Sequence, residues 1–273
     1  MDQITNYRTI QEILYSCNEK SYMASEYLVP EHALTYVISG EFGINKFGKK
    51  YTYGAGESVL FKRNELARFT KDPLGETPFS CVTIFFMQPF LQKYYTTNAP
   101  AQAFLKEEHE SYLKMIPFCT DPLFESLFNS VLPYYKYSNP LPQELISMKL
   151  MEAMTILRTI NKKGTDSILS DFAEPGKIDL GDFMEKNFTY NVNLERFGYL
   201  TGRSLATFKR DFQKTFNTTP QKWLLQKRLE QAHFLLTTNK KKPSEVYLEV
   251  GFENLSHFSA SFKQMFGYNA SSL

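Results

Sequence analysis

The sequence lacks the features that mark membrane and secreted proteins. No apolar run in this chain of 273 residues approaches the ~20 residues that a membrane-spanning helix needs. The opening stretch MDQITNYRTIQEIL contains early acidic residues, and it does not follow the charged, apolar and small-residue order of a signal peptide. We therefore predict a cytoplasmic protein without a membrane partner.

Cysteine and histidine are scarce, and neither forms a pattern that would hold a metal. The cysteines are isolated and odd in number: Cys17, Cys81 and Cys119. They predict reduced, buried thiols and not disulfides or a zinc site. The 4 histidines are scattered without metal-ligand spacing, and the chain has no nucleophile elbow, P-loop or dinucleotide fingerprint. The sequence thus predicts no enzyme, no metal and no cofactor.

The strongest positive signal is a helical pattern that is written twice at an offset of 50 residues. Its apolar positions are Leu205, Phe208, Phe212 and Phe216 in the first copy and Leu255, Phe258, Phe262 and Phe266 in the second. Spacings of three and four place such side chains on one stripe of an α-helix. Upstream, Phe197 and Leu200 match Tyr247 and Val250, and a glycine follows each pair. Each copy therefore predicts a short helix, a turn and a longer helix, which is a helix-turn-helix unit.

A further helix is predicted between the two copies. Thr219 and Pro220 have the chemistry of an N-cap and a first helical residue, and the helix should extend to about Leu236. At roughly 1.5 Å per residue it would form a rod about 25 Å long. Such a rod could hold two reading helices about one DNA turn, roughly 34 Å, apart.

These segments resemble the DNA-binding domain of the AraC/XylS family of bacterial transcription regulators. The similar stretches read LERFGYLTGRSLATFKRDFQKTF at 194–216, PQKWLLQKRLEQAHFLL at 220–236 and EVGFENLSHFSASFKQMFG at 249–267. The resemblance implies a protein that binds promoter DNA, activates transcription through RNA polymerase and is not an enzyme. It also places Arg228 in the linking helix, away from the DNA-facing helices, as a packing residue.

The longer helix of each unit is the one expected in the major groove, where polar side chains reach base edges. The first offers Arg203, Ala206, Thr207, Lys209 and Arg210, and the second offers Ser256, His257, Ala260, Ser261 and Lys263. An arginine can give two parallel hydrogen bonds to guanine, whereas small hydroxyls and one histidine read bases poorly. We therefore predict that the first unit discriminates sequence and the second mainly positions the protein. The alternative is that these residues form an ordinary solvated helix face.

Residues 22–86 predict short antiparallel strands, because aromatic and branched runs alternate with glycine, asparagine and proline turns. Such strands suggest a small barrel or sandwich, and the YGAGE turn at 53–57 resembles those of the cupin-like barrels found in the same family. A barrel interior can hold a small molecule. The polar candidates for effector contacts are His32, Tyr36 and Arg63. The stretch LFKRNEL at 60–66 instead resembles members that answer to a protein partner, so both kinds of effector stay open.

Helical patterns follow at 101–116, at 122–135 and after Pro142. The last of these has a wide apolar surface whose central stripe is Ile146, Leu150, Ala153 and Leu157. This stripe predicts either burial within the chain or a homodimer contact, and the family resemblance favours the dimer.

The predicted fold class is α+β, with an N-terminal cupin-like antiparallel β-barrel and following helices before an all-α domain of two helix-turn-helix motifs. We expect a regulatory and dimerisation domain at 1–160, a polar linker at 161–177 and a DNA-binding domain at 178–273. The last carries 13 Lys and Arg against 9 Asp and Glu. The competing hypothesis is a protein-interaction module that uses the helical repeats without sequence-specific DNA.

Overall fold

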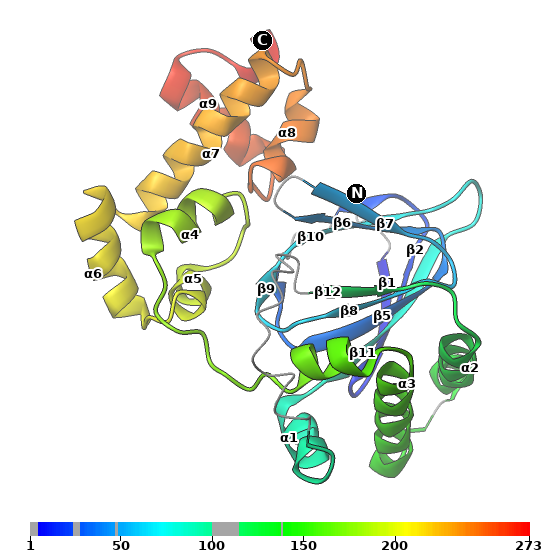
Figure 1. Cartoon of the computed structure of the whole chain (residues 1–273). Coiled ribbons are helices and arrows are strands. Elements are labelled where there is room, and N and C mark those ends of the chain that lie inside the picture. The colour runs from blue at the N-terminus through cyan, green and yellow to red at the C-terminus, as the bar shows by residue number, and fades with distance from the viewer. Residues whose placement is uncertain (1–4, 24–27, 47–48, 100–114, 138) are drawn as a thin grey trace. The chain divides into compact units, whose positions relative to one another are not determined.

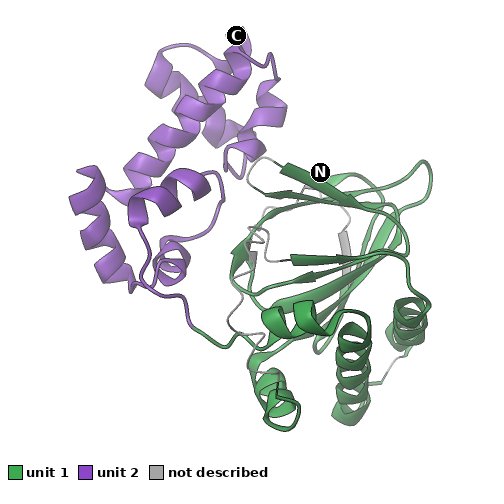
Figure 2. Cartoon of the chain, viewed as in Figure 1, with its two compact units in different colours: residues 1–24, 28–173 green, residues 25–27, 174–273 purple. Residues whose placement is uncertain are grey.

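A computed structural model of the chain describes residues 5–23, 28–46, 49–99, 115–137 and 139–273. It divides into two compact units, one of residues 1–24 and 28–173 and the other of residues 25–27 and 174–273 (Figure 2). The first unit contains the β-sheets and the second is helical. The predicted α+β class, with an antiparallel β domain before a helical domain, is confirmed.

Three antiparallel sheets build the first unit (Figure 1). The largest has the strand order β1 (Thr5–Ile10), β2 (Ile13–Asn18), β11 (Phe79–Phe86), β5 (His32–Ser39), β8 (Ser58–Phe61) and β12 (Met115–Phe118). The second has the order β3 (Tyr22–Met23), β10 (Arg68–Asp72), β6 (Glu41–Lys46) and β7 (Lys49–Tyr53), and the third pairs β4 (Leu28–Val29) with β9 (Glu65–Leu66).

The sequence prediction missed the first hairpin, because it started the β region at residue 22. Strands β1 and β2 pair from Thr5 opposite Asn18 to Ile10 opposite Ile13. β2 then pairs with β11, with Cys17 opposite Ser80. This hairpin depends on a strand that lies more than sixty residues later in the chain, a long-range pairing that local alternation does not reveal.

Side-chain alternation gives the central strands two apolar faces. One face packs between the sheets around residues such as Val37, Phe42, Ile44, Val59 and Phe61. The other face packs against helices α1 (Gln88–Thr97), α2 (Pro122–Val131) and α3 (Gln143–Leu169), with Leu34, Leu60 and Val82 among its residues. The first unit is thus layered as sheet, sheet and helices (Figure 1).

Three of the predictions for this unit compare with the structure as follows. The helix expected at 101–116 lies outside the described residues up to 114, and residues 115 and 116 begin β12. The helix expected at 122–135 is α2 followed by the 3-10 helix η2 (Leu132–Lys136). The linker expected at 161–177 is helical as far as Leu169, because α3 continues past a kink at Asn161.

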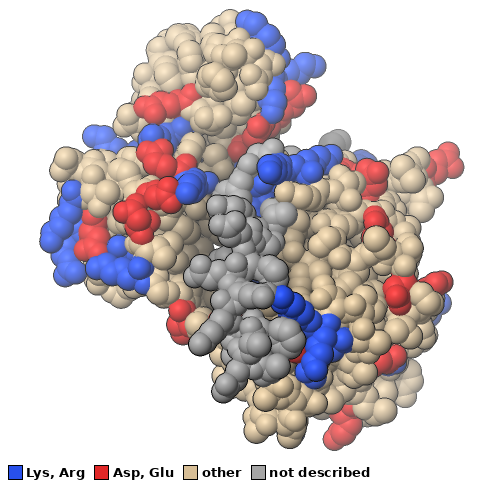
Figure 3. Space-filling view, in the orientation of Figure 1, with Lys and Arg blue, Asp and Glu red and all other residues tan. Residues whose placement is uncertain are grey.

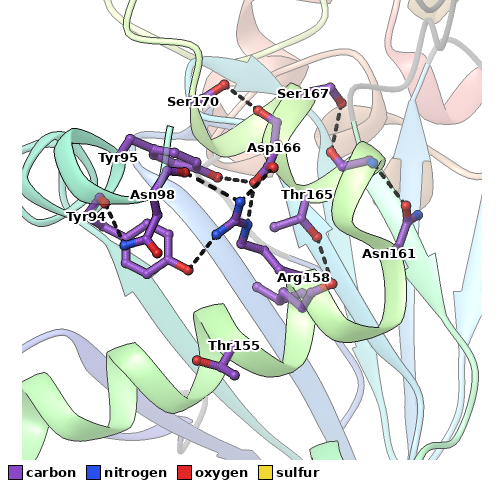
Figure 4. A network of polar contacts seen from close by, with 12 residues as sticks. Tyr94, Tyr95, Asn98, Thr155, Arg158, Asn161, Thr165, Asp166, Ser167 and Ser170 are labelled. Atoms are coloured by element: carbon purple, nitrogen blue, oxygen red, sulfur yellow. Dashed lines mark hydrogen bonds and ion pairs between the residues drawn. The ribbon is translucent and has the colours of Figure 1, made fainter. Parts of the chain in front are cut away.

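A buried polar network explains why α3 continues beyond the kink (Figure 4). The Asn161 carboxamide accepts a hydrogen bond from the Gly164 amide at 2.9 Å and so starts the second segment. The buried Asp166 carboxylate lies 2.9 Å from Arg158 Nε and accepts a hydrogen bond from the Tyr95 hydroxyl at 2.8 Å. A buried carboxylate needs such partners, and they hold the second segment in place although its composition reads as a linker.

The proposed dimer stripe is covered within the chain. Ile146, Ala153 and Leu157 are fully buried and Leu150 is 2 % exposed, because all four pack in the core that α3 shares with the large sheet. Of the two readings that the sequence left open, burial within the chain is correct for these residues. The large exposed apolar residues of α3 are instead Met148, Met151 and Ile160.

The three effector candidates do not line the space between the sheets. Tyr36 points to the helical layer, where its ring stacks on Phe128 with centroids 4.6 Å apart. His32 lies on the same face of β5 and is fully buried, and burial together with Arg63 and Lys62 lowers its pKa to about 3. Arg63 donates a hydrogen bond to the carbonyl of Ala173 at 3.1 Å. These contacts hold the three side chains within the first unit, and the effector contact stays a prediction for them.

The cysteines are free thiols, but only Cys81 is buried, whereas Cys17 is half-buried and Cys119 is exposed. The prediction of three buried thiols is therefore wrong for Cys119, which follows the short edge strand β12. Among the described residues, no helix combines the length and the apolar character that crossing a membrane requires.

The second unit is built from helices that connect through short turns. They are α4 (Leu180–Asn187), α5 (Leu194–Leu200), α6 (Leu205–Phe216), α7 (Pro220–Thr237), α8 (Pro243–Glu249), α9 (Leu255–Phe266) and the 3-10 helix η3 (Ala270–Ser272). The linking helix α7 begins as predicted, with Pro220 in the first turn and the Thr219 hydroxyl accepting a hydrogen bond from the Lys222 amide. Trp223 on this helix lies in the core between Phe188 and Phe212.

Candidate nucleic-acid interface

The two longer helices of the repeat, α6 and α9, have the same length and the same offset of 50 residues at both ends. Their matching phenylalanines, Phe208 with Phe258 and Phe212 with Phe262, are all fully buried. The apolar stripe of each helix therefore packs inward, as its spacing predicts. The opposite face of each helix is left free to carry other chemistry.

Equivalent residues begin and end the two helices. Ser204 caps α6 by accepting a hydrogen bond from the Thr207 amide, and Asn254 caps α9 by accepting one from the His257 amide at 2.8 Å. At the other end, Asn217 and Gly267 both adopt left-handed backbone angles, with φ values of 53° and 83°. The duplicated sequence thus folds into duplicated helices with matching caps.

The exposed face of α6 is polar and basic. Ala206, Lys209 and Arg210 are exposed, and Thr207 is half-buried beside the Ser204 hydroxyl. The Arg210 side chain is 66 % exposed and has only a distant ion pair with Asp211, at 3.6 Å. In Figure 3, blue side chains gather over the position of α6. This face offers long cationic side chains to an anionic partner.

Arg203 does not belong to this face. Its guanidinium is held by the Asp211 carboxylate at 3.1 Å and by the carbonyl oxygens of Ile178 and Thr201 at 3.0 and 2.7 Å. The side chain is only 7 % exposed, and the hydrogen bond from Arg203 holds the pKa of Asp211 below its ordinary value. The structure does not support the prediction that Arg203 reads DNA, because three of its five N–H donors already bind groups within the protein and fix the start of α6. Sequence reasoning did not foresee Asp211 as its partner.

The exposed face of α9 is chemically weaker. Ser256, His257, Ala260 and Lys263 are exposed, and Ser261 is half-buried. The His257 ring lies beside Phe252, with centroids 5.4 Å apart. Lys263 is the single cation of this helix. Small hydroxyls and one imidazole can meet phosphates, but they give few bidentate contacts to base edges.

Comparison with known proteins finds two families along the chain. Residues 32–165 match the family model described as the ExsA N-terminal regulatory domain, and residues 200–273 match a helix-turn-helix domain. The two matches fall in the first and the second unit respectively.

Whole-chain relatives are also found. The HTH-type transcriptional regulator ExsA of Pseudomonas aeruginosa is 23% identical over 248 residues, which cover 89% of this chain and 86% of that protein. The virulence regulon transcriptional activator VirF of Yersinia enterocolitica is likewise 23% identical, with 88% of each chain covered. A crystal structure of apo ToxT from Vibrio cholerae covers 96% of each chain at 13% identity, with a TM-score of 0.45.

Proposed function

Because the chain belongs to the AraC/XylS family of bacterial transcription regulators, we propose that α6 and α9 enter successive major grooves of one promoter site. The observation that carries this proposal is the pairing of two helices that are capped at equivalent positions, each with a buried phenylalanine stripe and an exposed polar face. A helix of this kind presents the face that the major groove can accept.

The residues proposed to touch DNA follow from exposure. On α6 they are Ala206, Thr207, Lys209 and Arg210, and on α9 they are Ser256, His257, Ala260, Ser261 and Lys263. Arg210 is the main base reader, since its fork is exposed and suits the O6 and N7 atoms of guanine. The α9 set, apart from contacts to thymine methyl groups, binds phosphates and fixes the register.

The regulator acts as an activator in this proposal, as the name of the VirF relative says of that protein. It works in the cytoplasm, contacts RNA polymerase and is controlled through its N-terminal unit, which matches a regulatory domain. The controlling signal is a small molecule or a regulatory protein, and the active form is a homodimer. A run-off transcription assay with purified polymerase tests activation directly, and sedimentation of the full chain tests the dimer.

Footprinting of the full chain on DNA upstream of its own gene tests the central claim. We expect protection of two patches about one helical turn, roughly 10 bp, apart. Affinity should fall steeply as salt rises, because cationic side chains displace condensed counterions from the phosphates. Repeating the footprint with cell extract supplies a source of effector. Salt-independent binding, or protection without sequence preference, would favour a protein-interaction module instead.

A matched pair of variants tests the base reader. Arg210→Ala should cost about 1–3 kcal/mol on the natural site, the range for a bidentate base contact. Lys186→Ala also removes one exposed cation, here from α4, where Lys186 pairs with Asp182 at 2.8 Å, and it should bind almost like the unchanged protein. A loss below about 1 kcal/mol for Arg210→Ala, or equal losses for both variants, rules out base reading by Arg210.

A further inference from the structure

Two apolar cores in the helical unit share the linking helix α7. Near the start of α7, Trp223 packs against the aromatic rings of Phe188, Phe212 and Phe216. The later part of α7 packs with α8 and α9 through a second core that includes Leu229, Ala232, Leu236, Val246, Phe258 and Phe262. The two reading helices therefore belong to different cores: α6 lies in the half that also contains α4 and α5, and α9 lies in the half that also contains α8. The placement of α6 relative to α9 depends on the contacts that join these two halves.

Arg228 lies on α7 between these cores and bonds to both halves. Its Nε donates to the carbonyl of Phe188 at 2.8 Å, and one terminal nitrogen donates to the carbonyl of Tyr190 at 3.0 Å. Both carbonyls follow the end of α4, where backbone oxygens have no partner within the helix. The other terminal nitrogen donates to the carbonyl of Gly251 at 2.9 Å, in the turn before α9.

The α8–α9 turn, which belongs to the second helix-turn-helix unit, also packs closely on the α4–α5 connection beside Arg228. Gly251 has a φ of +95°, and a Cβ placed there would lie 2.6 Å from the carbonyl oxygen of Thr189 and 3.0 Å from Arg228 Nε. No side chain fits at such a distance. The glycine therefore lets the α8–α9 turn approach the α4–α5 connection closely enough for one guanidinium to bind both.

Beside this junction a cavity of about 560 Å³ lies between the two halves. Its lining comes from both halves, with Asn193 and Leu194 on one side and Phe252 and Asn254 on the other. At its rim, Asn191 donates a hydrogen bond to the exposed Glu253 carboxylate at 2.8 Å. Such exposed contacts are weak, whereas Arg228 is half-buried and makes three hydrogen bonds that reach both halves.

We propose that Arg228 is a positioning residue that fixes the separation of α6 and α9 and thereby sets the half-site spacing that the protein accepts. This inference rests on the proposed DNA-binding function. Arginine suits the role because its planar fork directs several donors to diverging acceptors, whereas a lysine ammonium acts as a single point charge. The sequence resemblance assigned Arg228 to packing alone.

The test measures binding to duplexes in which the two half-sites are moved apart or together by 1 or 2 bp. The unchanged protein should prefer one spacing clearly. For Arg228→Lys and Arg228→Ala, the affinity ratio between the preferred and the shifted spacings should fall roughly fivefold or more, the effect of losing a coupling between contacting groups. Affinity for an isolated α6 half-site should stay unchanged. The matched control is Lys227→Ala, which removes an ion pair with Glu185 at 2.8 Å and a cation–π contact with the Trp223 ring but none of the three Arg228 hydrogen bonds.

A second measurement works without DNA and therefore separates failure of this inference from failure of the proposed function. Spin labels on unnatural amino acids at the exposed positions Gln213 and Gln264 report the distance between α6 and α9. The full chain and Lys227→Ala should give a narrow distance distribution, and both Arg228 variants a broad one. Equal widths in all four proteins, or an unchanged spacing preference in the folded Arg228→Lys protein, would overturn the inference.

Discussion

The two helix-turn-helix units of this chain share their scaffold but not their surface chemistry. Position by position, at the offset of 50 residues, the buried phenylalanines and the capping residues correspond. The polar residues differ: Glu253 stands at the position equivalent to Arg203, and Ser261 stands at the position equivalent to Asp211. The first helix-turn-helix unit therefore contains an internal ion pair, between Arg203 and Asp211, at the start of its reading helix. In the second helix-turn-helix unit, Glu253 instead accepts a hydrogen bond from Asn191, which lies in the other half of the helical unit.

This difference separates what specifies the fold from what specifies the target. Apolar spacing and caps determine that α6 and α9 form and which face they bury. The exposed residues contribute little to the formation and packing of these helices. They can therefore differ, with base reading proposed for the first helix-turn-helix unit and phosphate binding for the second. Four experiments on α6 and α9 test this difference.

The largest effect is expected from the shared scaffold. Phe208→Ala and Phe258→Ala each remove a fully buried ring, and each should lower the free energy of unfolding by about 3–5 kcal/mol. Denaturant unfolding, followed by far-UV circular dichroism and by the fluorescence of Trp223, the sole tryptophan, measures both losses. If one ring costs less than half as much as the other, the two units are not equivalent scaffolds.

The next effect concerns sequence reading. Arg210→Ala should weaken binding to the natural site by about 1–3 kcal/mol and flatten the discrimination between bases under α6. His257→Ala, on the corresponding face of α9, should cost less than about 1 kcal/mol, because an imidazole at this position meets phosphates or single acceptors. Titrations against duplexes with single base-pair changes, at one fixed salt concentration, measure both effects. A larger cost for His257→Ala would reverse the proposed division between the units.

A smaller effect isolates the positioning role of α9. Lys263→Ala should reduce the slope of log affinity against log salt by about 0.9, the value for one lost phosphate contact on duplex DNA. It should weaken binding nearly uniformly across base-substituted duplexes. Lys214→Ala provides a comparison from the last turn of α6. A change in base preference for Lys263→Ala would show that α9 reads sequence as well.

Most of the helical unit could be predicted from sequence, because its signals are local. The phenylalanine stripes, the Thr219–Pro220 start and the turn glycines act within a few residues, and the structure has each of them in place. In the β-sheet unit, residues 1–24 and 28–173, the missed β1–β2 hairpin and the helical continuation of α3 depend on partners far away in the chain. Strand β11 and the Tyr95 hydroxyl supply those partners.

The candidate site was predictable in outline but not residue by residue. Exposure of Lys209 and Arg210 followed from the helical period. Arg203 was misassigned because its role depends on the backbone carbonyl of Ile178 and on Asp211, eight residues later. Arg228 was assigned to packing, although its three carbonyl partners come from two separate turns. Sequence patterns give the direction of a side chain, but they do not give its partners.

The smallest expected effect tests the Arg203–Asp211 ion pair of the first helix-turn-helix unit, which has no equivalent in the second because Ser261 replaces Asp211 there. In the folded protein the hydrogen bond from Arg203 keeps the pKa of Asp211 below its ordinary value of 3.8. A carboxyl group with a depressed pKa stabilises the fold above its unfolded pKa, and this contribution is lost as pH falls through the lower folded pKa. Asp211→Asn should therefore lower Tm near neutral pH, and its difference from the unchanged protein should shrink as pH falls below about 4. Ser261→Ala, at the corresponding position of α9, should show a difference that does not depend on pH. Thermal unfolding of the three proteins between neutral and acidic pH measures these curves. A pH-independent difference for Asp211→Asn would mean that Arg203 is held by its backbone acceptors alone, and that the two units differ less than their sequences suggest.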